Sequence, residues 1–280
     1  MKKITRRSFL AAAGLSVAAL ALTACGGSSS STASSVASSA AASSEAASSS
    51  AAAAELTTVE AGKLTMATNA TFPPYEMTTD TGAFEGIDID TAQAIADKLG
   101  LELQVDDMDF DAALLSVQQG KADIVMAGVT VTDERKAVMD FSDSYATGIQ
   151  SIIVPEGSDI ASPDDLAGKK IGTQRGTTGY LYCSDDFGDE NVVAYDSGLT
   201  AVQALNNGQV DCVVIDNAPA QEYVAANPGL VVLDTSYAEE DYAIGMAKGS
   251  PLEDAINAAL KELKDDGTLQ SIVDKYIVAE

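Results

Sequence analysis

The sequence predicts an α/β protein with two lobes, and two observations carry that prediction. Short apolar or alternating stretches of strand length follow one another with helical patterns between them, and this order implies sheets with helices on their faces. The alternation restarts after an extended stretch at 145–149, so we expect two α/β units with a cleft between them. In sheets of this kind, ligands bind at the carboxyl ends of the strands.

The first unit begins near Val59 and contains three predicted strands and two predicted helices. Polar and apolar side chains alternate in the first strand, as they do in a half-buried strand. The first helix has apolar residues at helical spacing and stops at Gly100. The last strand is a nearly continuous apolar run, which suits a strand covered on both faces. In chain order the elements are a strand at 63–68, a helix at 88–99, a strand at 101–105, a helix at 110–119 and a strand at 122–127.

The second unit continues the alternation to the end of the chain. Ser162 and Pro163 are typical of an N-cap followed by a first-turn proline. The run from Arg175 to Gly179 leads from a strand into a helix that begins near Tyr180. The other expected elements are strands at 152–154, 170–173, 192–195, 210–215, 230–233 and 241–246, and helices at 199–206, 218–226, 252–264 and 269–277.

Composition and charge exclude several classes of function. The chain has 280 residues, with 16 Lys and Arg against 42 Asp and Glu, a net charge of -26 and no His. A net anion without a basic stripe cannot displace counterions from phosphate, so nucleic acid is not an expected partner. The absence of His removes Ser-His-Asp and Cys-His nucleophile chemistry and the commonest zinc ligand. We therefore expect no catalytic residues, no metal and no cofactor.

Residues 1–24 are typical of an export signal, because basic residues precede an apolar stretch at 9–24. Residues 22–25 resemble a bacterial lipoprotein box, in which Cys25 receives lipid such as palmitate and becomes the new N-terminus. Residues 5–10 also resemble a twin-arginine signal, and the general secretory route stays open as the alternative.

Residues 25–58 form a predicted tether between this lipidated Cys25 and the folded chain. The stretch at 26–54 is almost entirely Ser and Ala, so no apolar face exists to pack. A flexible chain of this length reaches about 30 Å. The acidic surface repels anionic lipid headgroups, so the lipid has to supply the membrane anchor. We expect the protein on the extracytoplasmic side of the cell membrane.

Six motifs in the remaining chain resemble the polar amino-acid binding proteins of ABC importers, the bacterial extracellular solute-binding proteins of family 3. The likeness runs from about Lys63 to Tyr276, and its motifs are residues 67–76, 86–90, 108–111, 127–135 with 140–142, 174–179 and 215–216. The resemblance implies a periplasmic-binding-protein-like fold, with two mixed sheets joined by a two-segment hinge. Lobe 1 is expected at 59–147 plus 243–280 and lobe 2 at 148–242, with hinges near Tyr145 and Tyr242.

A free amino acid carries a carboxylate and an ammonium close together, so a selective site needs a fixed cation and a fixed anion. Arg135 is the candidate cation, because a guanidinium holds a carboxylate through two parallel N–H bonds. Alone, an Arg near a helix start is more often a solvated surface charge, but the strand end at Gly128 points the following loop into the cleft. Thr130 adds its hydroxyl or backbone N–H to the carboxylate, and Gly128 adds a carbonyl to the ammonium. The resemblance implies the same roles.

Asp216 ends the apolar strand before it and is the candidate anion for the ammonium. From spacing alone it is equally well a helix N-cap, and the resemblance favours the ammonium role. Thr177 and Thr178 lie between two glycines before a helix, where backbone N–H groups can face an anion. A Gly-Thr-Thr-Gly run is otherwise only a turn.

The resemblance implies that Phe72 and Phe110 form apolar walls around the ligand side chain, although each alone is better explained as core. Asn69 stands where relatives that bind cationic amino acids often have a carboxylate. A neutral or polar amino acid is therefore favoured over Lys or Arg. Gln174 is a further candidate contact for the ligand side chain, whereas Arg175 is expected to be solvated.

These residues predict a monomeric lipoprotein that captures an amino acid and delivers it to an ABC permease in the membrane. One alternative is an enzyme similar to cyclohexadienyl dehydratases, with Glu76 as the nearby general acid. A second is an amino-acid sensory domain. Cys183 and Cys212 both fall in the second unit, where an extracytoplasmic location permits a disulfide. Cys212 lies in an apolar strand, however, where a buried free thiol is common, so a free thiol is favoured and the disulfide stays the alternative.

Overall fold

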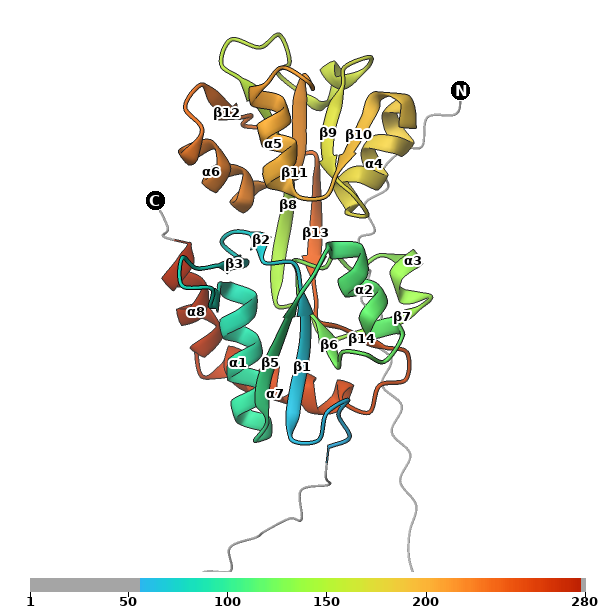
Figure 1. Cartoon of the computed structure of the whole chain (residues 1–280), viewed down its shortest axis with the longest axis vertical. Coiled ribbons are helices and arrows are strands. Elements are labelled where there is room, and N and C mark those ends of the chain that lie inside the picture. The colour runs from blue at the N-terminus through green and yellow to red at the C-terminus, as the bar shows by residue number, and fades with distance from the viewer. Residues whose placement is uncertain (1–55, 278–280) are drawn as a thin grey trace, which may run out of the picture. The chain divides into compact units, whose positions relative to one another are not determined.

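The computed structural model describes residues 56–277, which form two mixed sheets with helices on their faces (Figure 1). The predicted signal at 1–24, the lipid site at Cys25 and most of the tether lie outside the described residues. None of the helices in the described part is long and apolar enough to cross a bilayer.

The sheet of lobe 1 has the strand order β5-β1-β6-β14-β7. Its strands β1 and β5 are parallel, as are β1 and β6, whereas β14 runs antiparallel to both of its neighbours. The strands are β1 (Lys63–Thr68), β5 (Glu102–Asp107), β6 (Ile124–Val125), β7 (Met139–Phe141) and β14 (Gly245–Ala247). A small sheet lies beside it, made of β2 (Thr71–Phe72), β3 (Glu76–Thr78) and β4 (Phe84–Glu85). The helices of this lobe are α1 (Ile87–Leu99), α2 (Phe110–Gln118), α3 (Asp133–Lys136), α7 (Glu253–Asp265) and α8 (Thr268–Tyr276).

The sheet of lobe 2 has the order β10-β9-β11-β8-β12, and β13 also pairs with β8. The strands β9, β10 and β11 are parallel, and β8 is antiparallel to β11, β12 and β13. The strands are β8 (Ala146–Pro155), β9 (Ile171–Gln174), β10 (Val192–Tyr195), β11 (Cys212–Asp216), β12 (Leu230–Val232) and β13 (Ala238–Tyr242). The helices are α4 (Thr178–Phe187), α5 (Gly198–Asn206) and α6 (Asn217–Ala226), with short 3-10 turns η1 (Pro163–Leu166) and η2 (Asp189–Asn191).

The chain passes between the two sheets in β8 and β13, which pair with each other in antiparallel register (Figure 1). The pairing runs from Ala146 opposite Tyr242 to Gln150 opposite Ala238. These two strands lie where the sequence predicts the two hinges. The lobe boundaries at 59–147 plus 243–280 and 148–242 stay a prediction.

Three predicted elements differ from the structure. The strand expected at 241–246 is divided, because β13 pairs with β8 in one sheet and β14 pairs with β6 and β7 in the other. The strand expected at 122–127 pairs over Ile124–Val125 only. The helix start expected at Ser162 is a 3-10 turn, held by a reciprocal cap between Ser162 and Asp165.

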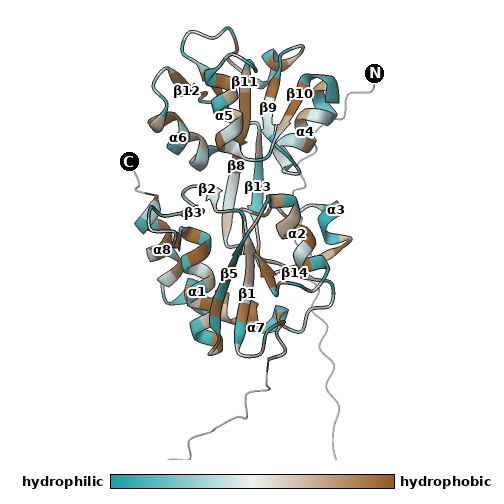
Figure 2. Ribbon diagram, viewed as in Figure 1, coloured by the Kyte–Doolittle hydropathy of each residue, from teal (hydrophilic) through white to brown (hydrophobic). Residues whose placement is uncertain are grey.

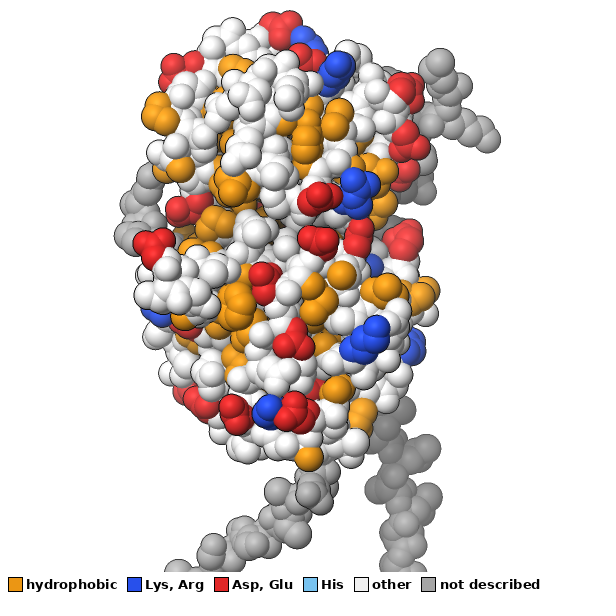
Figure 3. All heavy atoms as spheres, viewed as in Figure 1, with side chains coloured by type: hydrophobic (Ala, Val, Ile, Leu, Met, Phe, Trp, Pro, Cys, Tyr) orange, Lys and Arg blue, Asp and Glu red, His pale blue; other side chains and the backbone are white. Residues whose placement is uncertain are grey.

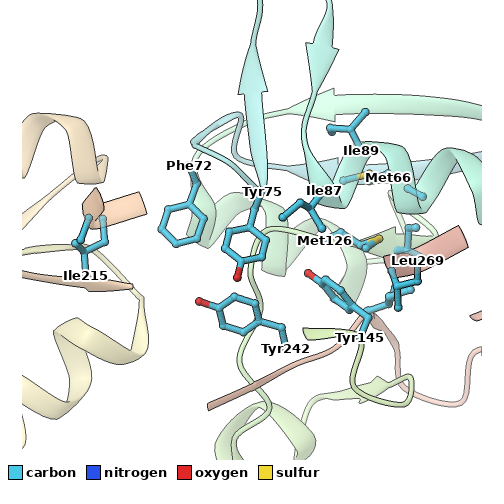
Figure 4. Close-up of a cluster of buried hydrophobic side chains, with 14 of the residues drawn as sticks. Met66, Phe72, Tyr75, Ile87, Ile89, Met126, Tyr145, Ile215, Tyr242 and Leu269 are labelled. Carbon is cyan, nitrogen blue, oxygen red and sulfur yellow. The ribbon is translucent and has the colours of Figure 1, made fainter. Parts of the chain in front are cut away.

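Apolar side chains are concentrated in the central strands of both sheets, whereas β13 is mostly hydrophilic (Figure 2). In lobe 1 the buried side chains of Met66, Ile87 and Met126 pack together, and Tyr75 and Tyr242 meet edge to face with ring centroids 5.3 Å apart (Figure 4). Cys183 and Cys212 are buried in the core of lobe 2 and are both free thiols, and burial raises the pKa of each to about 12.

Candidate functional site

All ten residues predicted to contact a ligand line one cavity, to which both lobes contribute. The cavity and its open mouth together contain about 320 Å³ of empty space. Its walls also include two residues that were not predicted as ligand contacts, Glu76 and Ala127. The lining residues are Asn69, Phe72, Glu76, Phe110, Ala127, Gly128, Thr130 and Arg135 from lobe 1, and Gln174, Thr177, Thr178 and Asp216 from lobe 2.

The cavity lies at the carboxyl ends of strands, as the sequence predicts for an α/β sheet. Asn69 follows the last residue of β1, Gln174 is the last residue of β9, and Asp216 is the last residue of β11. At Gly128 the backbone has φ 54°, and a Cβ there would lie 2.9 Å from the Phe72 ring. Glycine is therefore required for this close approach of the chain to the cavity wall.

Arg135 is buried in the short helix α3, with 9% of its surface exposed. Its Nη1 donates to the carbonyl of Thr130 at 2.7 Å, and its Nη2 donates to the carbonyl of Gly176 at 3.2 Å. The guanidinium carbon lies 5.4 Å from the centroid of the Phe110 ring. Burial lowers the pKa of Arg135, but an Arg side chain stays charged in proteins. Two carbonyls use two of its five N–H groups, so donors remain for a carboxylate.

Asp216 occupies the N-cap position of α6, but its side chain makes no capping bond. Instead Oδ2 accepts from Nε2 of Gln150 at 2.9 Å, and Oδ1 accepts from the hydroxyl of Tyr242. Neither partner is a cation, and burial raises the pKa of Asp216 to about 7. The side chain is thus directed to the cavity and not to the start of its helix.

The Gly-Thr-Thr-Gly run begins α4 at the edge of the cavity. Thr177 caps the helix, because its Oγ1 accepts from the backbone N–H of Tyr180 at 3.3 Å. The same hydroxyl donates to the carbonyl of Gln174 at 2.8 Å. Thr178 is buried, and its Oγ1 donates to Oε2 of Glu240 at 2.9 Å.

The remaining predicted contacts form the walls. Phe72 and Phe110 are both buried, and Phe72 stacks on Tyr75 with ring centroids 5.8 Å apart, so each ring is at once core and cavity wall. Gln174 Nε2 donates to Asn69 Oδ1 at 2.8 Å across the two lobes. Arg175 is exposed, as predicted, and lies 3.8 Å from Asp196.

Glu76 lines the cavity and was assigned by sequence reasoning only to the enzyme alternative. It is fully buried, and neither carboxyl oxygen has a hydrogen-bond partner of good geometry in the described chain. Burial, with Asp88 nearby, raises the pKa of Glu76 well above its usual value. Asp88 has its own partners, the N–H of Gly128 at 3.0 Å and the Tyr145 hydroxyl at 2.7 Å. The sequence feature that could have identified Glu76 as a cavity residue was its position, four residues after Phe72 at the start of β3.

The described residues contain no group of three or more Cys, Asp or Glu side chains placed to hold a metal ion. The cavity instead combines one guanidinium, one carboxylate with neutral partners, a second buried carboxyl and two aromatic walls. This set of groups is suited to a small zwitterion.

Comparisons with known proteins agree with this chemistry. Residues 64–279 match the bacterial extracellular solute-binding proteins, family 3. The chain is 34% identical over 222 residues to a "Probable histidine-binding protein" of Neisseria gonorrhoeae, covering 77% of this chain and 83% of that one. It is 33% identical to the "Arginine-binding extracellular protein ArtP" of Bacillus subtilis, covering 78% and 87%.

Solved structures show the same fold. An ancestral arginine-binding protein bound to glutamine superposes with a TM-score of 0.74 at 42% identity, covering 78% of this chain and 99% of that one. The arginine-, lysine-, histidine-binding protein ArtJ of Geobacillus stearothermophilus superposes with a TM-score of 0.75 at 34% identity, covering 78% and 96%.

Proposed function

Because the chain belongs to the bacterial extracellular solute-binding proteins of family 3, we propose that it captures one free amino acid between its lobes and delivers it to an ABC importer. The observation that carries this proposal is that Arg135 of lobe 1 and Asp216 of lobe 2 line the same cavity. Arg135 binds the ligand carboxylate, and Asp216 binds the ammonium together with the Gly128 carbonyl. Charge-assisted hydrogen bonds of this kind are about twice as strong as neutral ones.

Entry of the ligand requires the lobes to separate, because both lobes line the cavity and side chains such as Gln174 and Asn69 bond to each other across it. Hydrogen bonds that join the lobes must open, among them those from Arg135 to the Gly176 carbonyl, from Gln174 to Asn69, and from the Tyr223 hydroxyl to the Thr71 carbonyl at 2.5 Å. The ligand then shifts the population back to the closed arrangement, since it contacts both lobes only there. Strands β8 and β13 are the hinge.

The side chain of the ligand is expected to donate hydrogen bonds. The aromatic rings of Phe72 and Phe110 pack against its apolar part, and Asn69, Gln174 and Glu76 line the same space. Burial favours the protonated form of Glu76 in the ligand-free cavity, and a cationic ligand side chain would favour its ionised form, so a basic side chain is no longer disfavoured. Relatives are named as binding proteins for histidine, cystine, arginine and glutamine.

The surface charge also favours a ligand that is neutral or cationic. Acidic side chains are more frequent than basic ones on the face shown in Figure 3, and the whole chain carries a net charge of -26. A surface of one sign raises the encounter rate of opposite charges and lowers that of like charges. We therefore propose arginine-like or glutamine-like ligands and not acidic ones.

We propose that residues 1–24 are removed on export and that Cys25 carries the lipid anchor of a monomeric protein. The support is the sequence pattern around Cys25 and the extracellular setting of the family. Metabolic labelling with an alkyne analogue of palmitate tests this: the wild-type chain is labelled and the Cys25→Ser variant is not. Equal labelling of both chains contradicts the proposal.

Calorimetric titration of the full-length chain with the twenty amino acids tests the proposed function. At least one is expected to bind, and Arg135→Ala is expected to lose about 100-fold in affinity for it, since a buried partner of a charge pair is removed. The matched control is Arg175→Ala, which deletes an exposed arginine and changes affinity by less than about twofold. Unchanged affinity in a folded Arg135→Ala variant removes Arg135 from the site.

Relatives are named as arginine- and glutamine-binding proteins of ABC transporters, and we propose that this chain is likewise not an enzyme. The raised pKa of Glu76 is the one feature that a dehydratase would share. Turnover of prephenate by the wild-type chain, lost in Glu76→Gln, would establish that alternative.

A further inference from the structure

Glu240 is a buried acidic residue in one of the two strands that connect the lobes. It lies in β13, opposite Gly148 of β8, and only 6% of its surface is exposed. Its neighbours Glu239 and Asp241 point outward and are exposed. A carboxylate taken out of water in this way is costly unless it is hydrogen-bonded, so its partners have to account for its position.

One carboxylate oxygen of Glu240 accepts hydrogen bonds from three donors. Its Oε2 accepts from Oγ1 of Thr178 at 2.9 Å, from Nε2 of Gln150 at 3.0 Å and from Oγ1 of Thr130 at 3.1 Å. The two threonine hydroxyls lie 3.4 Å apart. Both threonines line the cavity, whereas Glu240 lies behind them and does not.

The two threonines come from different lobes. Thr130 belongs to the segment after β6, whose backbone is bonded to β13 through Val131 N–H to the Asp241 carbonyl at 3.0 Å. Thr178 is the first residue of α4 in lobe 2. One oxygen lies within 3.1 Å of both hydroxyls only while the lobes are together, so these bonds favour the closed arrangement.

Glu240 also decides which way the hydroxyls point. An ionised carboxylate can only accept hydrogen bonds. Each threonine hydroxyl therefore donates its one proton to Glu240 and leaves its lone pairs facing the cavity. A hydroxyl in that orientation accepts from a ligand ammonium and cannot donate to a ligand carboxylate. Thr130 is then left with its backbone N–H for the carboxylate.

The same carboxylate acts on both charges of the site. Gln150 Nε2 donates to Glu240 and to Oδ2 of Asp216, so it holds the two carboxylates in a fixed relation. On the other side, the negative charge of Glu240 is the largest influence that raises the pKa of Arg135 against the effect of burial. Glu240 thus acts on both Arg135 and Asp216 without lining the cavity itself.

We propose that Glu240 is a positioning residue that couples closure of the lobes to the orientation of the Thr130 and Thr178 hydroxyls, and that it thereby slows ligand release. The proposal rests on the proposed amino-acid capture. It predicts a specific kinetic change, because a bond made only in the closed arrangement affects dissociation and leaves the encounter of ligand with the open lobes unchanged.

Stopped-flow binding with L-arginine and L-glutamine as probes tests the proposal on the full-length chain. Glu240→Ala removes the acceptor, and we expect dissociation to be at least tenfold faster while the association rate changes by less than about twofold. Glu240→Gln keeps a neutral acceptor, and dissociation is expected to be several-fold faster. Glu239→Gln is the matched control, since it removes one negative charge from the exposed neighbour on the same strand, and its rates are expected to equal those of the wild type.

A double-mutant cycle separates positioning from a merely structural role. Thr178→Val is expected to accelerate dissociation about tenfold in the wild-type chain and less than about twofold in a Glu240→Ala background. Equal effects in both backgrounds, or wild-type dissociation in Glu240→Ala, overturn the proposal. If Glu240→Ala does not fold, the same cycle with Glu240→Gln decides it, and unchanged dissociation in that variant overturns it.

Failure of the proposed function gives a different result. If the wild-type chain binds neither probe nor any other amino acid, amino-acid capture is wrong. Small-angle scattering of the ligand-free proteins then tests the remaining claim: Glu240→Ala is expected to have a larger radius of gyration than the wild type, and Glu239→Gln is not. Equal radii overturn the proposal.

Discussion

The two lobes present their charges to the cavity in opposite ways. In lobe 1, Arg135 donates to the Thr130 carbonyl of its own lobe, besides the Gly176 carbonyl of lobe 2, and stays a cation at all ordinary pH values. In lobe 2, Asp216 has only the neutral partners Gln150 and Tyr242, and burial raises its pKa to about 7. The cation is therefore ready before the ligand arrives, whereas the anion is fully ionised only when a positive charge comes to it. We therefore expect the ammonium end of the ligand to carry the pH dependence of binding.

Among the variants that test this difference between the lobes, Asp216→Asn is expected to change ligand affinity the most. Loss of the anion is expected to weaken amino-acid binding by about 3 kcal/mol, or about 100-fold, as for a buried charge pair that loses one partner. The same variant is expected to be more stable than the wild type at pH 8, because burial no longer penalises an ionised carboxylate. Calorimetry and chemical denaturation measure the two effects. Reduced stability at pH 8 contradicts the assignment of Asp216 as the strained anion.

The pH dependence of binding gives the next effect. Because the folded protein holds the Asp216 proton up to a pH of about 7, binding of an ammonium below that pH has to release a proton. Affinity is therefore expected to fall by up to about tenfold per unit as the pH drops below 7. Titrations between pH 5 and pH 8, in buffers of different ionisation enthalpy, measure both the affinity and the released proton.

The control for this pH dependence is Asp216→Asn, since Asp88 also has a raised pKa, of about 6. The slope is expected to be lost in that variant. A slope that persists there assigns the pH dependence to the Glu76 and Asp88 pair in lobe 1, and the comparison between the lobes is then wrong.

Removal of the N-cap at the start of α4 in lobe 2 is expected to change stability and ligand affinity the least. Thr177→Val removes the N-cap of α4 and is expected to lower the free energy of unfolding by about 1 kcal/mol, with a change in ligand affinity of a few-fold. Ser197→Ala is the matched control, because it removes the cap of α5 in the same lobe, away from the cavity. Both variants are expected to lose similar stability, and only Thr177→Val to weaken binding. An equal loss of affinity in both shows that the cap acts through lobe stability alone.

Much of the fold could be predicted from periodicity, because strands such as β1 and helices such as α1 bury one regular set of side chains. The division of the predicted 241–246 strand could not be found in this way. Residues 238–247 form one extended run of apolar and polar residues. The change of partner from β8 to β6 and β7 depends on contacts with segments 88 to 122 residues earlier in the chain.

The sequence predicted which residues come together at the site, but it did not predict the hydrogen bonds between them. Strand ends and the family resemblance placed Arg135, Asp216 and the two threonines together, and they line one cavity in the structure. The role of Glu240 was not predictable, since Glu239, Glu240 and Asp241 are three successive acidic residues and only the strand pairing shows which one is buried. Glu76 was seen in the sequence but was not assigned to the ligand, because its lack of a partner is a property of packing.

Arg135 is the proposed partner of the ligand carboxylate, and a ligand that lacks the carboxylate charge tests this role. Calorimetry compares the affinity of the best-binding amino acid with that of its α-carboxamide, which lacks the carboxylate charge, in the wild-type chain and in Arg135→Ala. The wild type is expected to prefer the free acid by at least tenfold, and Arg135→Ala is expected to bind the two compounds equally. An Arg135→Ala variant that keeps the full preference for the free acid would contradict it.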